Sequence, residues 1–197
     1  FKQADRYSHS LNLFNSKILK KINQIDPDII NLHWINNETI SINQISKLKK
    51  PIVWTMLDMW PMCGGEHYTE NTRYIEGYKN SNRDKNERGI DLNKWIWKQK
   101  IHNWEKIKFN VICISEWLKL EAKKSVMFRN ELVTKINLPI DLSIWKLIEK
   151  KQARQNLGLP LNKKILLFIS TNGTKDLRKG FKFVDNAMKK ILLNTKY

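Results

Sequence analysis

The sequence predicts an α/β fold, a parallel sheet with helices on both faces. Three observations support this prediction. Short apolar, β-branched runs alternate with longer segments of helical periodicity, which is the order that a parallel sheet requires. The apolar content of 41% is enough for a core. The length of 197 residues fits one domain and part of a second, and no run approaches the roughly 20 apolar residues of a membrane-spanning helix.

The predicted elements alternate between helix and strand along most of the chain. Asp91 and Ser115 have side chains that cap helix starts. The polar stretch over 69–89 has no period, so we expect a long loop that is functional or disordered. The elements up to residue 136 are a helix over 11–25, a strand over 29–34, a helix over 36–48, a strand over 52–56, a helix from Asp91 to Trp104, a strand over 109–115, a helix over 116–125 and a strand over 132–136.

The segment beyond residue 146 predicts one further β-loop-α unit. Its expected elements are a linker helix over 148–157, a strand over 165–170 and a helix over 180–193. A single strand has no neighbours that could bury both of its faces. We therefore expect residues 1–146 to form a partial N-terminal domain, and residues 147–197 to form the linker helix and the start of a truncated second domain.

The charge is strongly positive, with a formal net value of +17. Such a field attracts nucleic acid, anionic lipid or phosphorylated small molecules. Lys, Asn and Ile are abundant throughout, and the basic residues are scattered along helices instead of lying beside a nucleic-acid motif. We therefore favour background basicity with a phosphate-binding task over dedicated nucleic-acid binding.

Cys63 and Cys113 are the two cysteines. They could pair, but the first residues have no signal-peptide pattern, so we expect reduced thiols in a cytoplasmic protein. Cys63 and His67 have a spacing compatible with metal ligation. Two ligands fall short of the three or four that zinc needs, so no metal is expected.

The most informative segment follows the predicted strand over 52–56. There the chain passes abruptly into Asp58, Trp60, a proline and the pair Gly64–Gly65. Ligands bind at the carboxyl ends of strands in open α/β sheets, because strand ends and helix starts meet there. The sequence therefore predicts a ligand site, or the remains of one, at this edge of the sheet.

Several motifs then occur in a specific order. They are His33-Trp34 at a strand end, the run from Pro51 to Pro61 with Gly64-Gly65 and His67-Tyr68, Ser115-Glu116-Trp117-Leu118, Leu138-Pro139-Ile140-Asp141 before Trp145, and Asp176-Leu177-Arg178-Lys179-Gly180-Phe181. From about Pro27 onward, this order resembles the GT-B glycosyltransferases of family 4, in the subgroup of bacterial polysaccharide-biosynthesis enzymes.

The resemblance implies a two-domain enzyme that transfers a sugar from a nucleotide-sugar to a polysaccharide or lipid-linked acceptor. The transferred sugar would keep its anomeric configuration. A Rossmann-like N-terminal domain would receive the acceptor, and the second domain would bind the donor. No metal cofactor is implied, because Arg178 and Lys179, just before a glycine-led helix, would hold the donor phosphates. Lipid-linked acceptors imply a cytoplasmic protein, peripheral at the inner face of the membrane, with Trp95 placed to contact lipid. Nucleic acid is not an expected partner.

On the acceptor side, the resemblance assigns five residues: His33, Asp58, Trp60, Gly64 and Gly65. Three of them have a simpler alternative. Asp58 would cap the turn that follows it, Trp60 would fill the core, and His33 would make a structural hydrogen bond.

Leu57 departs from the pattern, because the subgroup usually has a histidine there that faces the transfer site. Leucine neither donates a hydrogen bond nor carries a proton, so the catalytic group is unknown. Glu66 stands where relatives often have cysteine. The opening strand with its glycine-rich loop and the paired-glutamate motif are also missing. We therefore expect a fragment that is inactive alone. The alternatives are a non-catalytic binder of saccharide or nucleotide-sugar and, on charge alone, a basic nucleic-acid-binding protein.

Overall fold

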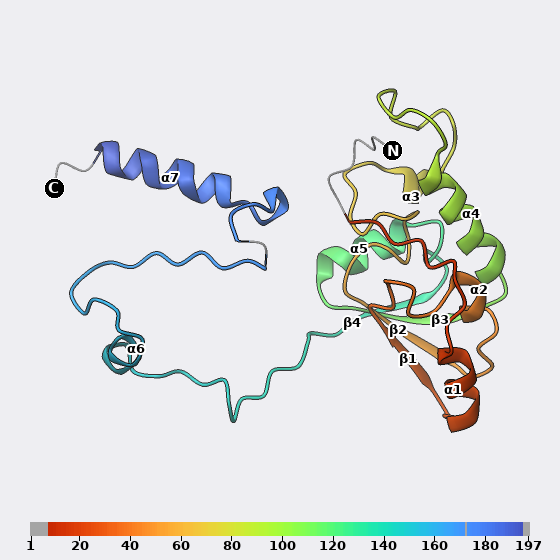
Figure 1. Cartoon of the computed structure of the whole chain (residues 1–197), viewed down its shortest axis with the longest axis horizontal. Coiled ribbons are helices and arrows are strands. Elements are labelled where there is room, and N and C mark those ends of the chain that lie inside the picture. Colours follow the sequence, from red (N-terminus) through yellow and green to blue (C-terminus); the bar gives the residue numbers. More distant parts are fainter. Residues whose placement is uncertain (1–7, 172, 195–197) are drawn as a thin grey trace. The chain divides into compact units, whose positions relative to one another are not determined.

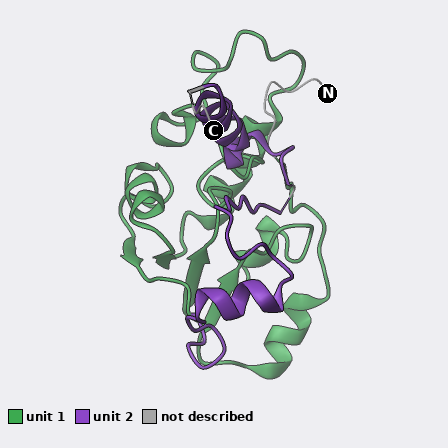
Figure 2. Ribbon diagram, turned by 90° about the vertical axis from the view of Figure 1, so that its left-hand side faces the viewer, with its two compact units in different colours: residues 1–139 green, residues 140–197 purple. Residues whose placement is uncertain are grey.

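A computed structural model describes residues 8–171 and 173–194. The chain divides into two compact units, residues 1–139 and residues 140–197, which Figure 2 colours separately. The sequence placed the boundary at residue 146, whereas this division falls after residue 139.

Unit 1 is built on a four-stranded sheet with the order β1-β2-β3-β4 (Figure 1). Every neighbouring pair of strands is parallel, and Trp54 lies in register between Leu32 and Val111. The predicted α/β class, with a Rossmann-like parallel sheet, is confirmed. The strands are β1 (Ile30–His33), β2 (Ile52–Met56), β3 (Phe109–Cys113) and β4 (Leu132–Lys135).

Helices flank the sheet. Asp91 and Ser115 cap α4 and α5 as predicted, since their side chains accept hydrogen bonds from the backbone N–H groups of Lys94 and Leu118. The helices of unit 1 are α1 (Ile18–Ile25), α2 (Ile42–Ile45), α3 (Arg73–Glu76), α4 (Leu92–Trp104) and α5 (Glu116–Lys124).

Two predicted helices were too long. The helix expected over 11–25 begins only at Ile18, and the one expected over 36–48 is reduced to α2. Asn12 explains the first difference, because it has a positive φ of 49° and its side-chain amide donates to the carbonyl oxygens of Ile35 and Ile40. These bonds hold the early segment as irregular chain against the β1–α2 connection.

The stretch over 69–89, predicted to lack secondary structure, contains α3. Its anchor is the buried side chain of Arg73, whose guanidinium is 2.5 Å from the Asp91 carboxylate. The same guanidinium also donates to the Lys79 carbonyl and the Asn82 side chain. This stretch is therefore tied to the start of α4.

The core of unit 1 is aromatic. Trp54 on β2 lies 5.2 Å from the ring of Trp104 and 5.5 Å from that of Phe109, between ring centroids. Trp60 and Phe128 pack on the same cluster. Large aromatic rings with tilted contacts bury much apolar area per residue, which lets a short sheet hold a stable core.

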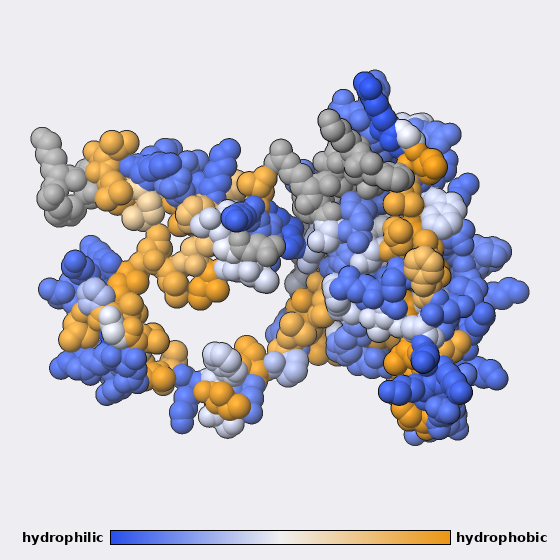
Figure 3. All heavy atoms as spheres, in the orientation of Figure 1, coloured by the Kyte–Doolittle hydropathy of each residue, from blue (hydrophilic) through white to orange (hydrophobic). Residues whose placement is uncertain are grey.

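Unit 2 contains the helices α6 (Lys150–Asn156) and α7 (Phe181–Asn194) and the short 3₁₀ helix η1 (Leu177–Lys179). The predicted strand over 165–170 was wrong, because no strand forms there. No described residue from 140 to 193 is buried, and Figure 3 shows hydrophobic residues exposed along this unit. A strand without a pairing neighbour has no ladder to join.

None of the helices in the described part of the chain is long and apolar enough to cross a bilayer.

Candidate functional site

The carboxyl ends of β1 and β2 bring together two side chains that are distant in sequence. β1 and β2 are parallel with His33 opposite Thr55, so the residues just beyond them share one edge of the sheet. There the indole nitrogen of Trp34 donates a 3.1 Å hydrogen bond to Asp58 Oδ2. This edge of the sheet therefore holds a cluster of interacting side chains.

Asp58 is the centre of this cluster. Its Oδ2 accepts from Trp34 and lies 2.7 Å from Nδ1 of His67, while its Oδ1 accepts from the backbone N–H of Trp60 at 3.0 Å. The residue is only 6% exposed. Both carboxylate oxygens are therefore occupied, and the turn cap that the sequence offered as an alternative is present.

His67 continues the chain of hydrogen bonds to the N-terminal segment. Because a carboxylate only accepts, Nδ1 of His67 carries the proton, and in the neutral ring Nε2 accepts the hydroxyl of Ser10 at 2.8 Å. Backbone bonds fix the same contact, from Ser10 N to Gly65 O and from His67 N to Ser8 O. We call Trp34, Asp58, His67 and Ser10 the site network.

The order Asp58–His67–Ser10 has the connectivity of a nucleophile triad. Ser10 is 7% exposed and His67 is 6% exposed, so a substrate carbonyl does not reach the hydroxyl in this conformation. Such a closed network holds its members in place and satisfies buried polar groups. Its role here is therefore to order the site.

Trp34 is the member of the network that meets solvent, with 45% of its surface exposed. Its ring centroid is 6.0 Å from that of His67, with the planes at 45°. His33, at the last position of β1, is also exposed. The sequence analysis named Trp34 only as part of a motif at a strand end and assigned it no role, and it did not single out Ser10. Nothing local marks Ser10, which lies 57 positions from His67.

Trp60 is completely buried. Its indole nitrogen donates to the Ser10 carbonyl at 2.8 Å, and its ring packs near Trp54 and Trp104. This is the core position that the sequence left as an alternative to sugar stacking. The exposed aromatic face at this edge belongs to Trp34.

Gly64 and Gly65 allow α4 to approach the loop after β2. A Cβ on Gly64 would overlap the backbone of Asn93, lying 2.7 Å from its Cα. The N–H of Gly64 donates to the hydroxyl of Tyr78, and that of Gly65 donates to the side chain of Asn93. The two glycines therefore shape the loop by packing and backbone bonding.

Lys100 is buried beneath the same loop. Its Nζ donates to the carbonyl oxygens of Trp60, Cys63 and Gly64, and lies 3.6 Å from the centroid of the Trp60 ring. Burial lowers the pKa of Lys100 to about 7, although the nearby groups of Cys63, Glu66 and Asp58 act to raise it. The sequence reasoning missed Lys100, yet its spacing of four from both Ile96 and Trp104 places it on the buried face of α4.

Burial also changes the pKa values of two neighbouring side chains, Cys63 and Tyr78. Desolvation raises the pKa of the Cys63 thiol, with the charge of Glu66 adding to the effect. Desolvation likewise raises the pKa of Tyr78, whose hydroxyl bonds to Glu66. Both groups are therefore neutral at physiological pH. Cys63 and Cys113 are free and buried thiols.

Leu57 is half-buried, and its carbonyl accepts from the hydroxyl of Tyr68 at 3.3 Å. Its side chain brings no proton-carrying group to the edge.

Arg178 and Lys179 lie in unit 2, in η1 directly before α7. Asp176 caps η1 by accepting from the backbone N–H of Arg178, and its carboxylate is 3.4 Å from the Arg178 guanidinium. Gly180 has a φ of 77°, which reverses the chain between η1 and α7. The two cations thus stand next to a helix start, as the sequence predicted.

Comparison with models of protein families, with curated proteins and with solved structures finds no match. The fold and the site network thus define the class of this protein as an α/β protein with a Rossmann-like parallel sheet.

Proposed function

We propose that unit 1 is the acceptor-side domain of a GT-B-type glycosyltransferase and that it binds a saccharide against Trp34. The acceptor would be a polysaccharide or lipid-linked sugar. The donor would be a nucleotide-sugar, with its phosphates held by Arg178 and Lys179 of unit 2. The motif order from His33 to Phe181 supports this proposal together with the parallel sheet.

The single observation that carries the proposal is the half-exposed ring of Trp34, fixed at the carboxyl edge of the sheet. Its N–H bond to buried Asp58 holds the ring in one orientation, so little rotational freedom is lost when a ligand stacks on it. A sugar presents an apolar C–H face that suits an aromatic ring, and its hydroxyls suit a nearby imidazole such as exposed His33.

A binding module without turnover is the second candidate, and Leu57 favours it. The site network uses both nitrogens of His67 and both oxygens of Asp58 internally. These two side chains are therefore already engaged, and neither is placed to take the role of the histidine that Leu57 replaces. Binding measurements separate from turnover measurements distinguish the two candidates.

The acceptor test uses the full chain on an array of bacterial oligosaccharides, with positive signals measured again by calorimetry. Trp34→Ala is expected to weaken binding about tenfold or more, the size of a lost aromatic contact in a site. Trp117→Ala is the matched control, because Trp117 is similarly exposed, at 52%, but lies on α5. Equal binding by the Trp34→Ala protein would refute the proposed platform.

The donor test measures binding of UDP-glucose and GDP-mannose. Arg178→Gln with Lys179→Gln is expected to weaken binding, whereas Lys190→Gln, further along α7, is not. A salt-titrated binding assay with duplex DNA runs in parallel. Steep salt-dependent DNA binding with no saccharide or nucleotide-sugar response would reject the transferase proposal.

A further inference from the structure

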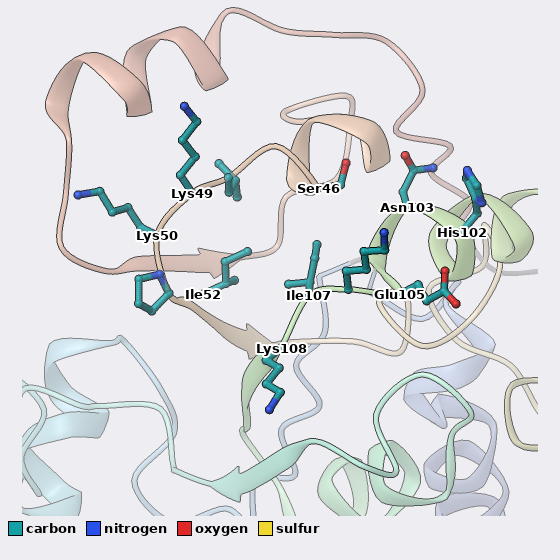
Figure 4. A pocket seen from close by; sticks show the side chains of 12 residues that line it. Ser46, Lys49, Lys50, Ile52, His102, Asn103, Glu105, Ile107 and Lys108 are labelled. Carbon is teal, nitrogen blue, oxygen red and sulfur yellow. The ribbon is translucent and has the colours of Figure 1, made fainter.

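A groove with a volume of about 720 Å³ lies at the edge of the sheet opposite to Trp34 (Figure 4). Its walls are the segment that leads into Ile52, the first residue of β2, and the segment that leads into Phe109, the first residue of β3. Both strands begin here, so this is the amino-terminal edge of the sheet. The groove is therefore separate from the candidate site at the carboxyl edge.

Part of the lining of this groove is aliphatic. Leu48 and Ile107 are half-buried, one on each wall, and both pack against the hydrophobic core. Pro51 and Ile52 complete the apolar lining. Apolar surface between two walls favours a ligand that carries apolar groups of its own.

Two hydrogen bonds hold the walls of the groove together. The side-chain amide of Asn43 on α2 donates to the side chain of Asn103 on α4 at 3.0 Å, and the indole nitrogen of Trp104 donates to the Ile42 carbonyl at 3.0 Å. These bonds join α2, which precedes one wall, to α4, which precedes the other. The groove is therefore formed before a ligand binds, and little free energy is lost in ordering it.

The charged side chains around the groove are mostly cationic. Lys50 is partly neutralised, because its Nζ lies 2.9 Å from Asp26. Within the described part of the chain, no ion pair holds Lys49, Lys106 or Lys108. One glutamate does not balance these lysines, so the groove attracts anionic groups. The titratable side chains of the lining are Lys49, Lys50, His102, Glu105, Lys106 and Lys108.

The lysines do not enclose a small anion. Figure 4 shows Lys49, Lys50 and Lys108 leaving the two walls in different directions, with their ammonium groups apart. A compact phosphate site would need converging donors. The spread of charge therefore favours a chain with separate anionic groups along its length.

The lining indicates which kind of chain this is. Sites for single-stranded nucleic acid use aromatic rings on which bases stack, but the described residues that line the groove include no Phe, Tyr or Trp. A second copy of this protein would be repelled, because each copy has a formal charge of +17. A polypeptide segment rich in Asp and Glu, with some Leu or Ile, matches both the lysines and the aliphatic lining.

We propose that the groove at the amino-terminal edge of the sheet binds an acidic segment of another protein. Leucine or isoleucine side chains of that partner would pack on Leu48 and Ile107. Its carboxylates would pair with Lys49, Lys106 and Lys108. The proposal does not depend on sugar transfer, because it uses neither Trp34 nor unit 2.

The test is fluorescence anisotropy of a labelled acidic peptide titrated with the full chain. The peptide has about twelve residues, glutamate throughout with leucine at every third position. Saturable binding is expected, and it should weaken at high salt, since exposed charges are screened. A second peptide with serine in place of leucine should bind about tenfold more weakly, because it has lost its apolar contacts.

Lys49→Gln with Lys108→Gln should weaken binding of the leucine peptide about tenfold, at about threefold for each exposed ion pair. Lys123→Gln with Lys135→Gln is the matched control, because both lysines are exposed, lie on α5 and β4 outside the groove lining, and remove the same charge. It should weaken binding much less. An equal loss in both double variants would show diffuse attraction by net charge and overturn the proposal, as would equal binding of the two peptides.

Nuclear magnetic resonance locates the bound peptide. The methyl signals of Leu48 and Ile107 should shift when the leucine peptide is added, and unchanged signals at saturation would place the peptide elsewhere and overturn the proposal. Far-UV circular dichroism checks that each variant folds.

Other occupants of the groove are tested in parallel with inorganic pyrophosphate, a DNA duplex and vesicles that contain phosphatidylglycerol. If the acidic peptide shows no saturable binding, the proposal is overturned. If one of these three probes then binds, and the Lys49→Gln, Lys108→Gln protein loses that binding, the groove belongs to that class of ligand instead.

Discussion

The stability of unit 1 should depend on pH through Lys100. Burial lowers the pKa of this ammonium from 10.5 to about 7 in the folded chain. The unfolded chain keeps the proton up to about pH 10. Between these values the unfolded state binds more protons than the folded state, so the free energy of unfolding rises with pH.

The size of the effect follows from the two pKa values. Above pH 7, the slope of the free energy of unfolding against pH approaches about 1.4 kcal/mol per pH unit. From pH 6.5 to pH 8.5 the free energy of unfolding should therefore rise by about 2 kcal/mol. The window stops there because burial raises the pKa of Cys63 and brings that of Cys113 to about 11. At higher pH the two thiols ionise in the unfolded chain before they do so in the folded chain, and this lowers the free energy of unfolding.

Urea unfolding followed by tryptophan fluorescence measures the effect, since Trp60 lies directly against Lys100. The control is Lys100→Met, which keeps the length of the side chain without a titrating group. Its free energy of unfolding should change little over the same window. Parallel pH profiles for the two proteins would refute the reasoning. They would mean that three carbonyl acceptors and the indole ring hold the ammonium form against the cost of burial.

Two substitutions test the packing around α3 and α4, both by urea unfolding. Gly64→Ala should cost about 3 kcal/mol, because the new Cβ would overlap the backbone of α4. Gly65→Ala, whose Cβ has no neighbour nearer than 3.4 Å, should cost less than about 1 kcal/mol; equal losses would contradict the argument. Arg73→Met should cost about 3 kcal/mol, because the mostly buried carboxylate of Asp91 would lose its nearest cation. Burial acts to raise the pKa of Asp91, but the hydrogen bonds from Arg73 and from the Lys94 N–H, together with the charges of Arg73 and Arg83, outweigh it and lower that pKa. The loss should therefore shrink as the pH falls below about 4. Arg83→Met, 3.8 Å from the same carboxylate, should cost less than about 1 kcal/mol.

The features that the sequence predicted well are those that depend on neighbouring residues. The strand over 52–56 was placed without error, because a short β-branched run between a proline and a turn has few other solutions. The caps at Asp91 and Ser115 are contacts over three positions, so the local sequence contains them. The helix predicted over 11–25 starts too early, because Asn12 bonds to carbonyls more than 20 positions away, at Ile35 and Ile40.

The candidate site shows the same limit. Its edge was predicted from strand order alone, yet its buried partner Ser10 could not be, because no periodicity links residues 10 and 67. Lys100 was readable in principle, since its helix spacing places it inward. A lysine is rarely expected inside a protein, because burying its ammonium group is costly. Lys100 is tolerated there because three carbonyl groups of the loop after β2 accept its hydrogen bonds.

Asp58 caps its turn and also orders the side chains around it. One carboxylate oxygen caps the turn by accepting from Trp60, and the other accepts from the indole of Trp34 and the ring of His67. Because both carboxylate oxygens already accept hydrogen bonds from protein groups, Asp58 has no further strong acceptor site for a sugar hydroxyl. Its effect on a ligand is therefore indirect and acts through the orientation of Trp34. An acidic residue at the end of a buried strand can thus build a site without touching the ligand, and Trp34→Ala, measured beside Trp117→Ala, tests the surface that it builds.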